Sequence, residues 1–201
     1  MSEQEDPVLS IFDETGARLR GHFRLTSGLH SSEYLQCAQV LQYPKWAEFL
    51  GTLMAHEFRR LDAALNIGVV AAPALGGLII GHEVARGLSA RFIFTERDAE
   101  GRMVLRRGFG VEPGEAAVVV EDVVTTGGSS REVIDLLLAA GARVIAAGSI
   151  IDRSGGAVNL GLPRIALKTM AAIAWKPEEC PMCQHGLPVV KPGSRPSHAK
   201  D

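Results

Sequence analysis

The stretch VVVEDVVTTGGSS, from Val118 to Ser130, decides how the rest of the chain is interpreted. It begins as an apolar run, reaches two acids, Glu121 and Asp122, and then crosses a turn rich in Thr and Gly. The glycines let backbone amides approach an oxyanion closely, the hydroxyls donate hydrogen bonds, and a following helix points its positive end at the same place. The stretch therefore predicts a phosphate-binding loop with two carboxylates beside it.

The two acids narrow the kind of ligand. Carboxylates repel a bare phosphate, but they accept hydrogen bonds from sugar hydroxyls or interact with a metal ion bound to the phosphate. The sequence has no GxxxxGK[ST], and its glycine spacing is not GxGxxG. The pattern predicts a sugar phosphate, and the plain alternative is an acidic strand end followed by a Gly-rich helix cap.

The composition fits one enzyme domain. The 201 residues are 46% hydrophobic and 22% charged, and the net charge of −2 gives no drive toward nucleic acid or an anionic membrane. No apolar run approaches the length of a membrane span, and the acidic N-terminus does not resemble a secretory signal. Three cysteines are too few for a disulfide framework. We expect a cytoplasmic enzyme with neither a nucleic-acid nor a membrane partner.

Hydrophobic periodicity predicts an α/β fold. Apolar runs typical of strands lie at 67–72, 90–95, 116–120, 144–151 and 165–169. Helical patterns lie at 8–20, 45–61, 78–88 and 129–140, and extended structure with a turn at Ser27-Gly28 is expected over 21–44. This alternation predicts a mostly parallel central sheet flanked by helices. Ligands bind beyond the carboxyl ends of such strands, where residues 73–77, 121–130 and 152–156 fall.

Several segments together resemble a known family. VVVEDVVTTGGSS resembles the phosphoribosyl-pyrophosphate signature of type I phosphoribosyltransferases. GHFRLTSGLHSSEYLQC, AAPALGGLIIGHEVA, LRRGFGVEPGE and IIDRSGG resemble four segments of the short bacterial and archaeal orotate phosphoribosyltransferases: the hood, the diphosphate-side loop, the end of the mobile loop and the orotate-binding Arg segment. The resemblance implies the type I phosphoribosyltransferase fold with a small N-terminal hood. One structural domain is implied, with the helix and hood over 1–62, the core over 63–175 and a C-terminal segment and tail over 176–201.

The resemblance also implies a reaction and its residues. The family transfers the 5-phosphoribosyl group from phosphoribosyl pyrophosphate to N1 of orotate, giving orotidine 5'-monophosphate and diphosphate in pyrimidine biosynthesis. The residues that would bind phosphoribosyl pyrophosphate are Glu121, Asp122, Val123, Val124, Thr125, Thr126, Gly127, Gly128, Ser129 and Arg97. Those that would bind orotate are Thr125, Arg153, Tyr34 and Leu35. The catalytic residues would be Arg102 and Asp122.

The loop of residues 96–110, which we call the arginine-rich loop, departs from the family. The family typically has a Lys there, thought to assist diphosphate departure, whereas this chain has no Lys between Lys45 and Lys168. Arg102 takes that place, and an Arg stabilises leaving charge but does not readily give up a proton. A solvated charged hairpin is the alternative. The resemblance further implies Mg²⁺ carried by the substrate, without direct protein ligands, and a homodimer in which each mobile loop reaches the neighbouring site.

Cys180 and Cys183 form a CxxC, which is half of a zinc site. A second pair is missing unless Cys37 or a dimer partner supplies it, so we expect packed or free thiols rather than a structural metal. Three histidines, His30, His56 and His82, are expected to be surface or core residues rather than ligands. Asp152 could orient Arg153 or merely end a strand.

Two other functions stay open. One is a phosphoribosyltransferase for another base, such as a purine, against which the hood segment and DRSGG argue. The other is a non-catalytic regulator that senses phosphoribosyl pyrophosphate. A sensor needs no cationic loop to stabilise a leaving group, so the four arginines of the arginine-rich loop favour the enzyme, while the missing Lys keeps the sensor open.

Overall fold

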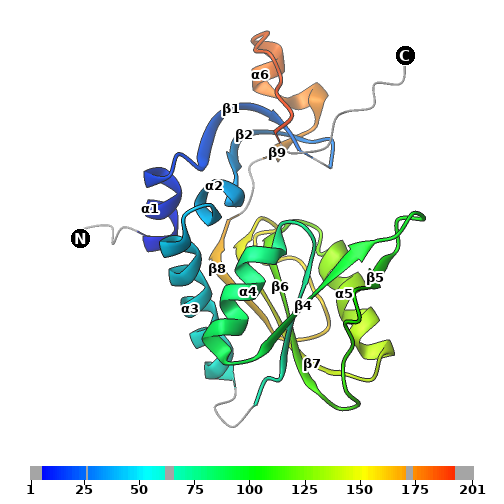
Figure 1. Ribbon diagram of the computed structural model, residues 1–201. Helices are drawn as coiled ribbons and strands as arrows, with labels where there is room; N and C mark the ends of the chain where they lie inside the picture. Colours follow the sequence, from blue (N-terminus) through cyan, green and yellow to red (C-terminus); the bar gives the residue numbers. More distant parts are fainter. Residues whose placement is uncertain (1–5, 26, 62–65, 171–173, 193–201) are drawn as a thin grey trace.

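The main body of the protein is a six-stranded sheet with the strand order β5-β4-β3-β6-β7-β8 (Figure 1). The computed structural model describes residues 6–25, 27–61, 66–170 and 174–192. The strands of this sheet are β3 (Val69–Pro73), β4 (Arg91–Arg97), β5 (Met103–Leu105), β6 (Ala116–Val124), β7 (Arg143–Asp152) and β8 (Arg164–Thr169). Neighbouring strands pair in parallel, except that β5 pairs antiparallel with β4. The predicted, mostly parallel sheet is confirmed.

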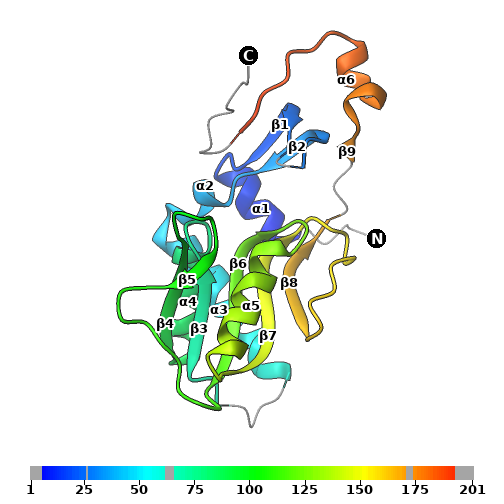
Figure 2. The same cartoon turned by 90° about the vertical axis from the view of Figure 1, so that its right-hand side faces the viewer.

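Helices cover both faces of the sheet (Figure 2). One face carries α1 (Pro7–Glu14), α2 (Cys37–Leu41), α3 (Pro44–Leu61) and α4 (Gly77–Leu88), and the other carries α5 (Gly128–Ala139). Strand residues alternate between the two cores: Val118 and Val120 pack with α3 and α4, whereas Ala117 and Val119 pack with α5. Because both faces of the sheet are covered, β3 and the first five residues of β6 are buried and apolar without interruption, as the sequence predicted. No helix in the described part of the chain is long and apolar enough to cross a membrane.

A second, smaller sheet lies above the carboxyl edge of the main sheet (Figure 1). It has the order β1-β2-β9 and consists of β1 (Arg18–Arg24), β2 (His30–Leu35) and β9 (Ala174–Trp175), paired antiparallel. β1 and β2 form a hairpin, and Gly28 in its turn has φ +84°, a conformation that favours glycine. We call this sheet the hood. The 3₁₀ turn η1 (Pro177–Glu179) and the short helix α6 (Pro181–Gln184) follow β9 on the outer side of the hood.

The first helix is shorter than the 8–20 that its periodicity predicted. α1 ends at Glu14, and Gly16 has φ +67°, a left-handed conformation that commonly ends helices. Leu19, which falls inside the predicted helical range, instead lies in β1 and pairs with Tyr34 of β2. Phe12 and Leu19 are seven residues apart, a spacing that matches two turns of a helix. The predicted helix over 8–20 was therefore wrong after Glu14, where the chain leaves the helix.

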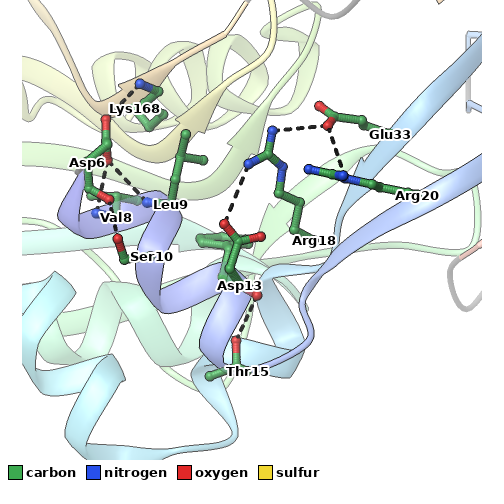
Figure 3. A network of polar contacts seen from close by, with 11 residues as sticks. Asp6, Val8, Leu9, Ser10, Asp13, Thr15, Arg18, Arg20, Glu33 and Lys168 are labelled. Carbon is green, nitrogen blue, oxygen red and sulfur yellow. Dashed lines mark hydrogen bonds and ion pairs between the residues drawn. The ribbon is translucent and has the colours of Figure 1, made fainter. Parts of the chain in front are cut away.

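A polar network ties α1 and the hood to the main sheet (Figure 3). Asp6 caps α1 by accepting hydrogen bonds from backbone amides of the first turn, and its second carboxylate oxygen lies 2.7 Å from Nζ of Lys168 on β8. Arg18 of β1 donates to Glu33 of β2 at 3.0 Å and lies 3.5 Å from Asp13 of α1. The hood is therefore linked to α1 through Arg18 and Asp13, and α1 is linked to the edge strand β8 through Asp6 and Lys168.

We predict that a side chain at Gly51 will separate α3 from α4. A Cβ at Gly51 would lie 2.4 Å from Cβ of Glu83 on α4, whereas a Cβ at Gly110 would meet no atom within 4 Å. Gly51→Val should lower the free energy of unfolding by about 1–3 kcal/mol through overpacking, and Gly110→Val should change it little. Urea unfolding followed by circular dichroism measures both variants. Equal stability of the two would contradict this close packing.

Candidate active site

A cavity of about 630 Å³ lies between the hood and the carboxyl edge of the main sheet. Its wall includes Tyr34 and Leu35 from β2, Asp122 from β6, Thr125 from the loop after β6, and Arg153 from the residue after β7. Strand ends of a parallel sheet therefore form its floor and the hood forms its roof. This is the position in which the sequence predicted a ligand site.

The three polar stretches expected at this edge do meet. A Cβ at Gly76 would lie 2.5 Å from Oδ1 of Asp122, so the 73–77 loop contacts the acid of β6. The backbone N–H of Arg153 donates to the carbonyl oxygen of Val124 at 2.8 Å, which joins the end of β7 to the end of β6. The ends of β3, β6 and β7 thus form one continuous surface.

The two acids of β6 lie on opposite faces of the strand. β6 runs four residues past its predicted end, so Glu121 and Asp122 belong to the strand rather than to a loop. Glu121 accepts a hydrogen bond from the Ser130 hydroxyl of α5. Asp122 lines the cavity, and its carboxylate accepts a hydrogen bond from the amide of Val123 at 2.9 Å. The sequence showed that the acids are adjacent but not that they point apart.

Burial raises the pKa of both carboxyl groups. Desolvation is the largest cause at Glu121, where the pKa rises to about 7 although the hydrogen bond from Ser130 lowers it. The Asp122 charge also raises the pKa of Glu121. Desolvation likewise raises the pKa of Asp122, against a hydrogen bond from the backbone of Val123. In the protein alone desolvation outweighs the hydrogen bonds that stabilise the charged forms of these acids, and a cation or further hydroxyl donors would offset it.

The loop between β6 and α5 has the form of an anion site. Gly127 has φ +75° and precedes the first residue of α5, Gly128. A Cβ at Gly127 would lie 2.6 Å from Cγ1 of Val158, so both the backbone conformation and the available space require glycine. As the N-cap residue, Gly127 offers no side chain to the first amides of the helix, which leaves them open to an anion.

Arg153 places a cation in the cavity wall. Its guanidinium lies 5.9 Å from the centre of the Tyr34 ring, and burial lowers its pKa. Within the described residues, no carboxylate lies within ion-pair distance of this guanidinium. Asp152 instead accepts hydrogen bonds from Ser154 and pairs with Arg164. Asp152 therefore shapes the turn after β7 rather than orienting its neighbour.

The arginine-rich loop folds back on itself. β5, which the sequence analysis did not predict, pairs with β4 inside it. Arg102 lies 2.8 Å from Asp98 in the same loop, and Arg97 lies 2.8 Å from Glu132 on α5. Neither guanidinium lines the cavity in the described part of the chain. The expected roles of Arg102 and Arg97 thus stay predictions that require the loop to move or a second chain.

Cys180 and Cys183 do not line this cavity; the helix α6, which includes Cys183, lies on the outer side of the hood (Figure 1). Cys180 and Cys183 lie beside His22 and His30, whereas Cys37 belongs to the cavity wall. Cys37 is therefore not the missing partner of the CxxC. His22 was not considered from the sequence, because 158 residues separate it from Cys180 and nothing local marks it.

Comparisons with known proteins agree with this geometry. A family model described as the phosphoribosyl transferase domain matches residues 37–161. The orotate phosphoribosyltransferase of Heliobacterium modesticaldum is 53% identical over 196 residues, which cover 95% of this chain and 98% of that protein. The one of Pelotomaculum thermopropionicum is 52% identical over 190 residues, covering 94% and 97%. The crystal structure of orotate phosphoribosyltransferase from Aeropyrum pernix matches with a TM-score of 0.68 at 27% identity, covering 81% of this chain and 93% of that chain.

We predict that Glu121 makes stability depend on pH. Its folded pKa of about 7 lies above the ordinary 4.5, so the folded protein binds more protons than the unfolded chain between these values. Stability should therefore fall as pH rises from about 4.5 to about 7, by roughly 3 kcal/mol. Glu121→Gln should remove this part of the slope, and Ser130→Ala should steepen it. Urea unfolding across this pH range measures the slopes, and parallel curves for all three proteins would contradict the assignment.

Proposed function

Because the chain belongs to the orotate phosphoribosyltransferases within the phosphoribosyltransferase family, we propose that its cavity joins orotate to the phosphoribosyl group of phosphoribosyl pyrophosphate. The products would be orotidine 5'-monophosphate and diphosphate. The observation that carries this proposal is Arg153, a cation in the cavity wall with no carboxylate in ion-pair contact among the described residues. A planar base that bears a carboxylate suits a guanidinium, which pairs with carboxylates through two parallel hydrogen bonds.

The sugar phosphate would occupy the loop side of the cavity. Amides and hydroxyls over 125–129 would donate to the 5-phosphate at the start of α5. Val123 and Val124 would contribute backbone groups beside it. Glu121 and Asp122 would accept from the ribose 2- and 3-hydroxyls, which stabilise the charged carboxylates and so lower their raised pKa values on binding.

Orotate would lie between the hood and the end of β7. Arg153 would pair with its carboxylate or a ring carbonyl, Thr125 would lie near the ring, and the backbone around Tyr34 and Leu35 would cover it. All four residues line the same cavity, which supports this placement.

Charge separates as N1 attacks C1 and the diphosphate departs. Positive charge develops on the ribose ring, where the Asp122 carboxylate would stabilise it. Negative charge develops on the diphosphate, which the backbone amides of the 73–77 loop and the arginine-rich loop would stabilise. Mg²⁺ binds mainly through substrate phosphates and water, so the acidic groups at this edge are compatible with a Mg²⁺ ion that arrives on the diphosphate. Carried by the substrate, Mg²⁺ would neutralise diphosphate charge.

The arginine-rich loop would act in a homodimer. The Arg102 side chain is 73% exposed, and its ion pair with Asp98 lies within its own loop. A second chain could therefore contact it without disturbing the rest of the fold. In this proposal each loop covers the cavity of the partner, and Arg102 stabilises the diphosphate that leaves there. The cytoplasmic location expected from the sequence belongs to the same proposal.

We predict that Arg153 determines the use of orotate. The wild-type chain with phosphoribosyl pyrophosphate and Mg²⁺ should consume orotate, measured as loss of its ultraviolet absorbance. Arg153→Met should lower kcat/KM for orotate about 100-fold, the effect of losing about two charge-assisted hydrogen bonds. Arg153→Lys should recover part of the lost kcat/KM, because lysine restores the positive charge but not the planar guanidinium that forms two parallel hydrogen bonds.

The same assay separates the alternative functions. Turnover of adenine or hypoxanthine but not orotate would assign another base. Tight binding of phosphoribosyl pyrophosphate without turnover of any base would assign the regulator.

We predict that inactive chains complement each other. Arg102→Ala and Asp122→Asn should each be inactive alone. A mixed dimer has one cavity with an intact Asp122 that faces an intact Arg102 loop from the partner, so random mixing should restore about one quarter of wild-type activity. Steady-state assays after dissociation and reassociation measure this. If Arg102 serves its own cavity, mixing will restore no activity.

A further inference from the structure

We propose that the outer side of the hood holds a structural zinc ion bound by two histidines and two cysteines. His22 lies in β1, His30 begins β2, and Cys180 and Cys183 lie at the start and the third residue of α6. One ligand atom from each of these four side chains lies within 4.8 Å of all the others. Two Cys and two His are one of the ligand sets that close a tetrahedral structural zinc site.

The separations between the ligand atoms fit such a site. Nε2 of His22 lies 3.5 Å from Sγ of Cys180 and 3.6 Å from Sγ of Cys183, and Nδ1 of His30 lies 3.3 Å from Sγ of Cys183. Tetrahedral zinc, with bonds of about 2.0 Å to nitrogen and about 2.3 Å to sulfur, separates the two atom types by about 3.5 Å. The two nitrogens are 2.8 Å apart and would move apart by about 0.5 Å.

His22 already has the orientation of a metal ligand. Its Nδ1 lies 2.8 Å from the carbonyl oxygen of Leu187. A carbonyl oxygen only accepts, so Nδ1 carries the proton and the lone pair of Nε2 points at the two sulfurs and at His30. Metal-bound histidines typically have their second nitrogen held in this way by a carbonyl or carboxylate, which fixes the tautomer and the ring.

Burial and charge also suit a metal. His22, His30 and Cys180 are buried, whereas Cys183 is exposed and leaves a path for the ion. Without an ion, Nδ1 of His30 donates to Nε2 of His22 at 2.8 Å, and the two thiols beside them are only weak hydrogen-bond partners. Two thiolates and two neutral imidazoles balance the charge of Zn²⁺, so the filled site is neutral. Zinc would displace the thiol protons to solvent, and no redox step is involved.

The site would join segments that are distant in the sequence. His30 pairs with Trp175 of β9, and the strand that it begins continues to Tyr34 in the cavity roof. The chain after α6 returns along β1, where the amide of Val190 donates to the carbonyl of His22 at 2.8 Å. Zinc would therefore fasten the C-terminal segment to the outer side of the sheet whose inner side covers the cavity.

Metal content and cobalt binding test this proposal, and neither requires enzyme activity. Wild-type protein purified without chelator should carry about one zinc per chain by elemental analysis. Cys180→Ser with Cys183→Ser, and separately His22→Asn, should lose the metal. His185→Asn is the matched control, because His185 is an exposed histidine two residues from Cys183 that lies outside the four-ligand cluster. This control should retain zinc. Reduced, metal-free wild type should bind Co²⁺ with a thiolate-to-cobalt absorption band.

The proposal fails if the wild type carries less than about one tenth of a zinc per chain and gives no cobalt–thiolate band. It also fails if Cys180 and Cys183 form a disulfide by mass spectrometry that persists in excess Zn²⁺ under mild reduction. The cobalt titration uses the wild-type chain, so it is decisive even where a variant does not fold. Zinc retained by a chain that does not turn over orotate would count against the proposed function alone.

Discussion

Burial of β6 between two layers of helices is the constraint from which the site follows. Its first five residues are buried, so successive side chains must enter separate cores. The same alternation continues into Glu121 and Asp122 and sends one carboxyl toward α5 and the other into the cavity. Desolvation at the strand end raises the pKa of both groups. The strand thus places both carboxyl groups where their charged forms are unfavourable, and in the proposed function a ligand with hydroxyl groups and a metal ion would offset that cost.

The end of β7 shows a comparable division between neighbours. Asp152 is fully buried and pairs with Arg164, an arrangement that is costly unless further hydrogen bonds satisfy the carboxylate. Ser154 and Gly156 supply those bonds, so one buried acid fixes the whole turn after the strand. The rigid turn leaves Arg153 in the cavity without an internal carboxylate partner among the described residues. In the proposed function, this guanidinium would therefore be available to pair with a carboxylate of the ligand.

Much of this architecture could be predicted from local patterns, and the parts that could not depend on distant contacts. Apolar runs predicted the central strands because both faces of the sheet are covered, and the chain direction then required 73–77, 121–130 and 152–156 to meet. Periodicity failed at Leu19, where a glycine turn outweighed helical spacing. Periodicity also gave no indication that His22 lies beside Cys180 and Cys183, which come from the other end of the chain. Nothing local distinguishes a histidine in an exposed hairpin from one facing a CxxC.

The ion pair of Arg102 with Asp98 bears on the catalytic role of the arginine-rich loop. The Arg102 side chain is 73% exposed, so water screens its attraction to Asp98 and such a pair contributes little. A departing diphosphate carries several negative charges, so in the proposed function it would compete well for the same guanidinium. In the proposed role, the internal pair would be a weak contact that holds the Arg102 guanidinium while the cavity is empty and that breaks when the diphosphate binds. Since arginine stays protonated, the contribution proposed for Arg102 would be electrostatic and would not include a proton transfer.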